Sequence, residues 1–348
     1  MRQSIFFSLA IFTVLLSAFA QYFTSSTGFQ FASASIAIIF LAGLLGKATE
    51  SVAHYAGDRI GGFLNATFGN AAELIIAIFL IKEGLFEMVK ASITGSIIGN
   101  LLLVLGLSLL AGGVKYKFQH FNPILAGHNA SLMLLGVIAL FIPAIYLGQL
   151  EQNSILTLSF VVAGVLILSY ILWLIFSMIT HKEELADNVH EGSKAVWSLR
   201  ISIFLLVIAT FFVAVESEWL VAGVEEVAES LGWSELFVGA FLIAIIGNAA
   251  EHSAAILLAI KNRIGASVEI AIGSSLQIAL FVGPVLVFIS LLFGNPMDIV
   301  FSPIELTAIA VSAFIAKSIS RDGMTNWFEG VLLLVVYIIL GTAFFFVS

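Results

Sequence analysis

The sequence contains no cysteine and few charged residues, and each shortage excludes a class of protein. Without cysteine among its 348 residues, the chain has no disulfide, no thiolate metal site and no cysteine chemistry. Only 10% of its residues are charged, against roughly 25% in a soluble domain, so the chain cannot cover itself with a water-facing surface. The net charge of −8 disfavours nucleic acid as a partner and favours cations.

The sequence is rich in hydrophobic residues, which make up 60% of the chain, with 31 Phe and a mean hydropathy of +1.11. A helix needs roughly 20 apolar residues to cross the hydrocarbon of a bilayer, and repeated runs of this length leave no room for a soluble catalytic domain. We predict an all-α integral membrane protein of about eleven transmembrane helices, near residues 4–21, 32–54, 61–81, 91–112, 123–147, 154–179, 197–216, 235–260, 267–293, 303–319 and 328–347.

Two segments allow more than one interpretation. Arg2, an apolar stretch and Ala18-Phe19-Ala20 would also suit a cleavable signal peptide, but we expect an uncleaved transmembrane helix within residues 1–27. The segment 216–232 carries five Glu residues, and it either extends the helix before it or forms an interfacial piece.

The basic residues are distributed unevenly between the two sides of the predicted membrane. With the N-terminus in the cytoplasm, the outer side receives only Lys82 and Lys90, and this asymmetry is the one that cytoplasmic loops show in membrane proteins. It predicts a cytoplasmic N-terminus and an outer C-terminus, in what we expect to be a prokaryotic plasma (inner) membrane. The inner side collects Arg2, Lys47, Arg59, Lys115, Lys117, Lys182, Lys194, Arg200, Lys261, Arg263, Lys317 and Arg321.

The stretch 180–196 is the one long polar connection that we expect. We interpret it as an acidic, solvated cytoplasmic linker between two halves of the chain; a cation-sensing regulatory loop is the alternative.

The two halves carry the same motif. Gly69-Asn-Ala-Ala-Glu73 recurs as Gly247-Asn-Ala-Ala-Glu251, 178 residues later (247 minus 69). We interpret 28–179 and 197–348 as one five-helix unit present twice. Because five is odd, the second unit must enter the membrane inverted, which is the architecture of alternating-access transporters. Further anchors occur in the same order: Gly61 and Gly239, Gly95-Ser96 and Gly273-Ser274, Phe121-Asn-Pro-Ile124 and Phe301-Ser-Pro-Ile304, and Glu50 and Glu225.

Each motif places an acidic residue inside an apolar helix. A carboxylate there costs about 2.5–3.5 kcal/mol, so Glu73 and Glu251 are candidates for a functional pair. Asn70 and Asn248 precede them by three residues and share their helix faces. Two carboxylates and two amides form an all-oxygen site, for which Ca²⁺ is the best match. The alternative is that both Glu residues are hydrogen-bonded structural groups.

Other residues of the two motifs and of the helices that follow them are candidates for support of this site. The glycines allow close helix approach or a local break that frees backbone carbonyls. The small polar residues would either orient the ligands or simply pack the helices. The candidates are Gly69, Gly247, Ser96, Asn100, Ser274, Ser275 and Gln277.

Further titratable residues have weaker assignments. His252 would relay protons beside Glu251 or would merely pack, and Glu50 and Glu225 would give protons access or would be hydrated helix ends. His128 is interpreted as structural. Glu305 follows Ser302-Pro303 and is best interpreted as a helix cap.

The paired motifs and Gly273-Ser-Ser-Leu-Gln-Ile-Ala-Leu-Phe281 resemble the cation/proton exchanger branch of the calcium/cation antiporter superfamily. The resemblance covers both halves and implies an eleven-helix Ca²⁺/H⁺ antiporter whose ion is bound by Glu73 and Glu251. Gly99 before Asn100 departs from the pattern, which would have a second Ser there.

Charge neutrality would couple the two ions. Burial and mutual repulsion favour protonated carboxyl groups, so one Ca²⁺ or two protons would cancel both charges, and we expect only a loaded site to change sides. A Na⁺/Ca²⁺ or K⁺-dependent exchanger of the same architecture is the alternative, and a passive channel would need no inverted repeat. We expect no enzyme, because Asp residues and protease motifs are absent from the predicted spans. We expect no cofactor, and the sequence leaves open whether the chain forms a homo-oligomer.

Overall fold

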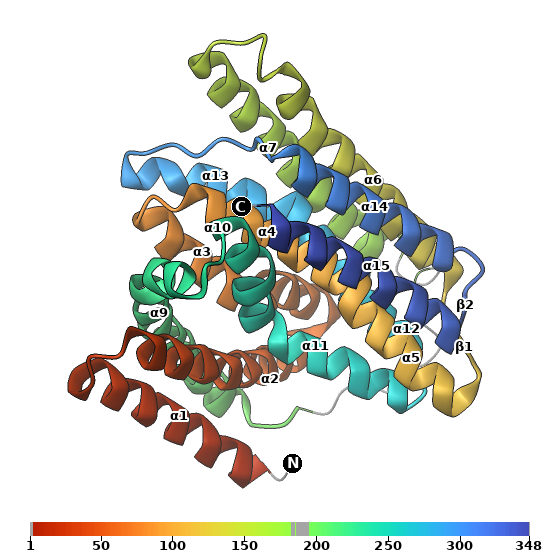
Figure 1. Ribbon diagram of the computed structural model, residues 1–348. Helices are drawn as coiled ribbons and strands as arrows, with labels where there is room; N and C mark the ends of the chain where they lie inside the picture. The colour runs from red at the N-terminus through yellow and green to blue at the C-terminus, as the bar shows by residue number, and fades with distance from the viewer. Residues whose placement is uncertain (1–2, 182–184, 186–194, 348) are drawn as a thin grey trace.

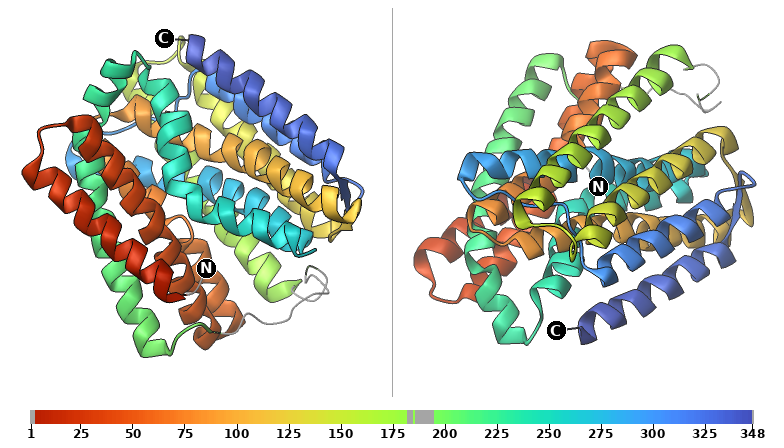
Figure 2. Two further views of the ribbon diagram at one scale, coloured as in Figure 1. Left: turned by 60° about the horizontal axis from the view of Figure 1, so that its bottom comes forward. Right: turned by 90° about the horizontal axis from the view of Figure 1, so that it is seen from above.

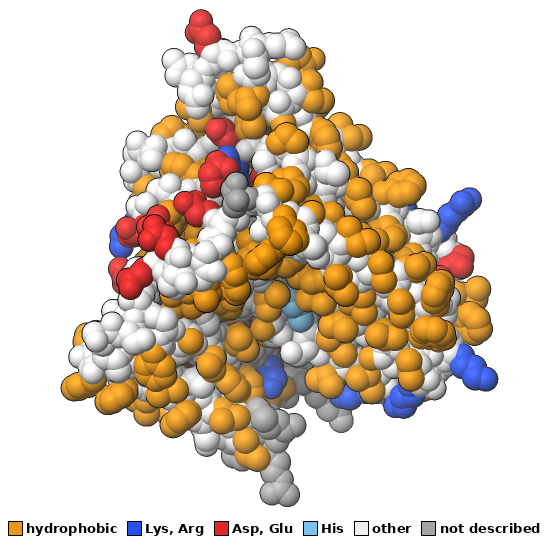
Figure 3. Space-filling model, in the orientation of Figure 1, with side chains coloured by type: hydrophobic (Ala, Val, Ile, Leu, Met, Phe, Trp, Pro, Cys, Tyr) orange, Lys and Arg blue, Asp and Glu red, His pale blue; other side chains and the backbone are white. Residues whose placement is uncertain are grey.

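The computed structural model describes residues 3–181, 185 and 195–347, and it is built almost entirely of helices (Figure 1). Nine of the described helices are long and apolar enough to cross a membrane by length and composition. Hydrophobic side chains cover most of the face seen in Figure 3. Phe204 and Phe314, for example, are 62% and 71% exposed. Such a surface is stable in lipid and unstable in water, so the fold is that of an integral membrane protein.

The first half of the chain, up to residue 181, forms seven α-helices, two π-helical segments and one short strand. These are α1 (Gln3–Phe23), α2 (Thr27–Phe68), α3 (Ala71–Lys82), α4 (Phe86–Ile98), η1 (Gly99–Val104), α5 (Leu105–Tyr116), β1 (Phe118–His120), α6 (Pro123–Tyr146), α7 (Gln152–Ile175) and η2 (Phe176–Thr180). The acidic linker predicted over 180–196 lies almost wholly outside the described residues.

The second half, from residue 195 to residue 347, is also built of helices with one short strand. Its elements are α9 (Leu199–Leu231), α10 (Glu235–Phe237), η3 (Val238–Ile243), α11 (Ala244–Ile260), α12 (Ile264–Gln277), η4 (Ile278–Val282), α13 (Gly283–Ser290), η5 (Leu291–Phe293), α14 (Pro303–Ile319), β2 (Met324–Asn326) and α15 (Trp327–Phe346).

Nine of the eleven predicted spans correspond to the nine long apolar helices, and the other two show why the numbers differ. The predicted helix 61–81 is interrupted: α2 continues to Phe68 through a bend at Gly57, and α3 begins only at Ala71. The predicted helix 303–319 is present as α14, which has 17 residues and lies at the short end of the lengths that cross the hydrocarbon.

The segment 216–232, for which the sequence left two interpretations, extends the preceding helix. α9 runs for 33 residues and ends at Gly232, whose φ of 66° lies in the left-handed region that glycine adopts without strain. α9 packs antiparallel along α2, since Gly223 lies against Thr27 and Phe31 at one end of the pair.

The two halves contact each other most closely where α4 crosses η3. A Cβ atom on Gly95 would lie 1.9 Å from the carbonyl oxygen of Ala240, and one on Gly239 would lie 2.7 Å from that of Met88. Each half therefore contributes one glycine to a backbone-to-backbone contact that a larger residue would prevent. This contact lies beside the second motif, because Ser96, which follows Gly95 in α4, is bonded to Asn248, and α11 follows η3.

A pair of three-residue strands joins the halves at one end of the molecule, where α5 and α15 also lie side by side (Figures 1 and 2). β1 pairs with β2 in antiparallel fashion, with Gln119 opposite Thr325. The amide of Phe121 extends the pairing by donating to the carbonyl of Gly323 at 3.0 Å.

Candidate ion-binding site

The first motif lies at a break in the chain of helices. Gly69 and Asn70 form a turn between α2 and α3, and Asn70 has φ −97° and ψ 27° at the start of α3 without capping it through its side chain. Glu73 therefore occupies the first turn of α3, where the unpaired amides and the helix dipole stabilise negative charge.

The second motif lies in an unbroken helix, although its residues are identical to those of the first motif. α11 continues through Gly247 and Asn248, and the irregularity occurs earlier, in the π-helical segment η3. The side-chain amide of Asn248 donates to the hydroxyl of Ser96, at 2.9 Å, and to the carbonyl of Ala244, also at 2.9 Å. The second motif is thus bonded directly to α4 of the first half.

The two motifs meet across the interface between the halves. A Cβ atom on Gly247 would lie 2.8 Å from Cγ of Glu73, so the side chain of the first acid rests on the glycine of the second motif. Two acids that are 178 residues apart in the sequence (251 minus 73) therefore share one region of the fold.

Three serines of α4 and α12 were predicted to support the site, and they differ in what they bond. The hydroxyl of Ser274 donates to a carboxylate oxygen of Glu251 at 2.6 Å. Ser275 is fully buried and donates to the carbonyl of Ala271 at 2.9 Å and to that of Ile97 at 3.4 Å. Ser96 accepts from Asn248. Of the three predicted supporting serines, one therefore bonds a carboxylate, one bonds an amide and one bonds backbone only.

Many buried polar atoms of this region have no hydrogen-bond partner among the described residues. Both carboxylate oxygens of Glu73 are in this group, which argues against a purely structural, hydrogen-bonded role for this acid. Buried polar atoms without partners are what a site for a cation or for water requires. The others are the side-chain oxygen and nitrogen of Asn70 and of Asn100, Oδ1 of Asn248, Nε2 of Gln277 and Nε2 of His252.

The candidate ion-binding site has few acidic side chains for a permanently bound metal ion. Within the described part of the chain, no three His, Asp or Glu side chains gather in a way that would hold a metal ion. Two carboxylates supplemented by amide oxygens suit an ion that is bound and then released.

The two acids predicted to give protons access lie away from this region. Glu50 is exposed on α2 and Glu225 is exposed on α9. Because these helices are antiparallel, with Gly223 near Thr27 and Ala209 near Leu45, the two acids lie toward opposite ends of the pair.

The remaining predicted residues take local roles. His128 contacts the rings of Trp173 and Phe176, at centroid distances of 6.0 and 5.5 Å. Glu305 forms the predicted capping box with Ser302, and the hydroxyl of Thr94 donates to its other oxygen at 3.3 Å.

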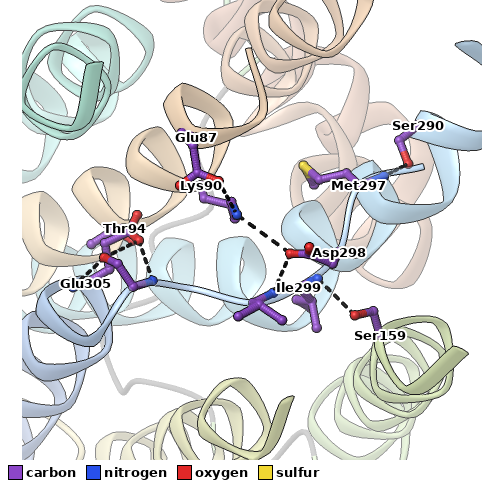
Figure 4. Close-up of polar contacts among 11 residues, drawn as sticks. Glu87, Lys90, Thr94, Ser159, Ser290, Met297, Asp298, Ile299 and Glu305 are labelled. Carbon is purple, nitrogen blue, oxygen red and sulfur yellow. Dashed lines mark hydrogen bonds and ion pairs between the residues drawn. The ribbon is translucent and has the colours of Figure 1, made fainter. Parts of the chain in front are cut away.

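A buried cation close to Glu305 was not predicted. Figure 4 shows Lys90 of α4 between Glu87, at 2.6 Å, and Asp298 of the segment before α14, at 3.6 Å. Its side chain is only 9% exposed. We expected Lys90 just before the predicted span 91–112, as a residue of an outer connection, whereas α4 begins at Phe86 and includes it.

Comparison with known proteins identifies the family to which the chain is related. The sodium/calcium exchanger protein family matches residues 26–179 and 201–346, which is most of the chain. The chain belongs to the sodium/calcium exchanger protein family. Both matched ranges contain one copy of the motif, so the family resemblance and the internal repeat coincide.

Relatives within the sodium/calcium exchanger family align over nearly the full length. The chain is 46% identical to the "Ca(2+)/H(+) antiporter" of Aphanothece halophytica, covering 99% of this chain and 97% of that protein. It is also 46% identical to the "Ca(2+)/H(+) antiporter ChaA" of Bacillus subtilis (strain 168), covering 98% and 99%. The solved structure of native YfkE is 44% identical, with a TM-score of 0.87 over 98% of this chain and 99% of that one.

Proposed function

We propose that this member of the sodium/calcium exchanger family exchanges Ca²⁺ for H⁺ across a membrane, with Glu73 and Glu251 as the residues that bind either ion. The observation that carries the proposal is the meeting of the two motifs, where Glu73 rests on Gly247 and its oxygens have no partner among the described residues. The names of the relatives, which are 46% identical over nearly the whole chain, support the choice of ions.

Charge accounts for the coupling between the two ions. Two ionised carboxylates in a buried site repel each other, and only a divalent cation or protons cancel both charges. An empty, doubly charged site is too unfavourable to pass through a closed state, so the protein changes sides only when it is loaded. Asn70 and Asn248 supply amide oxygens to the ion, and Ser274 holds Glu251 in place.

The finer architecture belongs to the same proposal. We infer two inverted five-helix units over 28–179 and 197–348, preceded by an N-terminal helix, with the broken helix of the first motif and α14 completing eleven crossings. The positive-inside distribution supports a cytoplasmic N-terminus and an outer C-terminus. Bacterial relatives support a plasma membrane location.

Transport in vesicles tests the assignment. In inside-out vesicles with an imposed pH gradient, the wild-type protein should accumulate radiolabelled Ca²⁺, and Glu73→Gln or Glu251→Gln should abolish accumulation because a neutral amide cannot trade a proton for the cation. Glu229→Gln, which removes an exposed carboxylate from α9, should transport normally.

Normal uptake by either site variant would refute the assignment. A sodium gradient in the same vesicles distinguishes Ca²⁺/H⁺ exchange from the alternative. If Na⁺ drives Ca²⁺ accumulation and a pH gradient alone does not, the protein is a Na⁺/Ca²⁺ exchanger of this fold.

Glu50, Glu225 and His252 are proposed to carry protons toward the site. Support comes from the opposite placement of the two Glu residues along α2 and α9, and from the Nε2 atom of His252, next to Glu251, which has no partner among the described residues. Glu50→Gln should slow exchange more than it weakens Ca²⁺ binding, and an unchanged rate would remove this residue from the pathway.

A further inference from the structure

A third acid lies inside the membrane-spanning region, apart from the pair described above. Glu216 is in the middle of α9 and is 0% exposed, so neither lipid nor water reaches it. One of its oxygens accepts a hydrogen bond from Ser17 of α1 at 2.5 Å. Its other oxygen has no hydrogen-bond partner within the described part of the chain, and neither has the hydroxyl of the adjacent, fully buried Ser217.

Among the residues that the structure describes, no cation is placed to neutralise Glu216. The helix α1 carries no charged residue between Gln3 and Phe23, and α2 carries none between Thr27 and Gly46. The charged groups of α3 are Glu73 and Lys82, and Lys82 pairs at 3.1 Å with Glu218 of α9, where both side chains are about half exposed. A lone carboxylate with one hydroxyl donor would be strongly disfavoured in this setting, so the folded arrangement requires a proton on Glu216.

The proton on Glu216 matters because α1 is a peripheral helix. It lies at the edge of the molecule in Figures 1 and 2, and its outer side chains, such as Ile11 and Leu15, are 60% and 64% exposed. Contacts between α1 and α9 flank the Ser17–Glu216 bond, with the rings of Tyr22 and Trp219 at 5.9 Å on one side.

Contacts on the other side of this bond lead to the candidate ion site. Val14, one turn before Ser17, packs against a cluster formed by Leu41, Ala42, Ala72 and Val213, and Val213 is one turn before Glu216. Ala250 packs against the same cluster. Ala72 and Ala250 immediately precede Glu73 and Glu251, so this inner apolar cluster joins the α1–α9 contact to both motifs.

We infer that Glu216 is a second proton-binding site of this protein, separate from the exchange pair, and that its proton holds α1 against α9. Loss of this proton leaves a buried charge that must be hydrated, which separates α1 from α9 and opens the layer between Val14 and the inner apolar cluster. The inference goes beyond the proposed exchange function and does not depend on which cation the protein carries.

The lack of cysteine makes a direct test simple, because a single introduced thiol reports on one position. In Val14→Cys, we expect alkylation by a maleimide to be slow at about pH 6 and to rise at about pH 9 beyond the ordinary effect of thiol ionisation. Val14→Cys/Glu216→Gln keeps an acceptor for Ser17 and cannot ionise, so it shows only the ordinary effect. Between these two pH values, the alkylation rate of Val14→Cys should rise about tenfold more than that of Val14→Cys/Glu216→Gln. A rise of this size is expected when a minor open state becomes well populated.

Two further variants keep the test decisive. Val14→Cys/Glu229→Gln should retain the excess, because it removes an exposed carboxylate of the same helix. Val14→Cys/Ser17→Ala should label faster at the acidic pH, because it removes the hydrogen bond from Ser17 to Glu216 that links α1 to α9. Equal pH dependence in Val14→Cys and in Val14→Cys/Glu216→Gln, measured on protein that remains monodisperse in detergent, would overturn the inference.

Discussion

The two copies of Gly-Asn-Ala-Ala-Glu have the same sequence and different backbones. The first copy interrupts a helix at Gly69–Asn70, and the second lies within the continuous helix α11. Among the described residues, the side chains of Asn70 and Glu73 have no hydrogen-bond partner. In the second copy, Asn248 is bonded to Ser96 and to Ala244, and Glu251 accepts from Ser274. The difference shows that the segments packed around each motif, and not its own residues, determine its backbone conformation and its hydrogen bonds.

Such asymmetry is what an alternating-access protein needs in any single state. If identical units adopted identical conformations, the site would be equally open to both sides of the membrane. Two units in different conformations can exchange their roles, and the exchange moves the site from one face to the other.

The largest expected effect comes from filling the space under Glu73. Gly247→Ala places a methyl group 2.8 Å from Cγ of Glu73, and that side chain must move away from the second motif. We expect proton-driven Ca²⁺ uptake to fall by about a hundredfold, since small displacements of reacting groups have effects of this order.

Gly273→Ala is the matched control, because nothing lies within 4 Å of the Cβ position on that glycine of α12. It should transport at nearly the wild-type rate. Similar losses in both variants would mean that the methyl group at 247 acts through general helix packing and not through Glu73.

A second prediction compares the two serines that form hydrogen bonds with the second motif, Ser274 with Glu251 and Ser96 with Asn248. Ser274→Ala removes the donor to Glu251, so protons compete better with the cation, and the Ca²⁺ concentration for half-maximal uptake should rise about tenfold. Because alkaline conditions oppose this competition, the deficit should shrink as the pH rises.

Ser96→Ala should have a smaller effect, about threefold, because Asn248 keeps its bond to Ala244 and the loss depends on the bonds that remain. The measurement is the Ca²⁺ dependence of uptake at several pH values. A larger effect from Ser96→Ala than from Ser274→Ala would contradict the expected order of the two hydrogen bonds.

The smallest expected effect concerns a feature that only the first half has. Lys90 is nearly buried beside Asp298, whereas the position 178 residues later is Val268. Asp298→Asn should lower the free energy of unfolding by about 1–2 kcal/mol, because it leaves Lys90 with Glu87 alone.

Glu218→Gln is the comparison for Asp298→Asn, since it breaks the exposed pair with Lys82. It should cost under about 1 kcal/mol. Thermal unfolding in detergent measures both variants, and an equal loss of stability would show that burial of Lys90 adds nothing.

Local signals in the sequence were sufficient for much of this structure. Ser302-Pro303 and Glu305 predicted both the start of α14 and the capping role of the acid, because a capping box is formed by neighbouring residues. We expected the two motifs to meet because an inverted repeat would place equivalent residues on either side of a pseudo-two-fold axis.

Other features depended on contacts between distant segments. The motif glycines left a close helix approach and a local break as alternatives, and the sequence could not decide between them, because the same residues precede a break at Ala71 and continue a helix at Gly247–Asn248. The burial of Glu216 depends on Ser17, 199 residues earlier, and the sequence presented this acid only as the first of five Glu residues at the edge of a span. The burial of Lys90 likewise depends on the segment before α14.

The short pairing of β1 with β2 has a mechanical consequence. Main-chain bonds between Phe118–His120 and Met324–Asn326 do not rely on side-chain identity, so they survive substitution at most of these positions. They tie the segment after α5 to the segment before α15 at the end of the molecule where these two helices lie side by side, so this end of the contact between the halves tolerates changes of side chain.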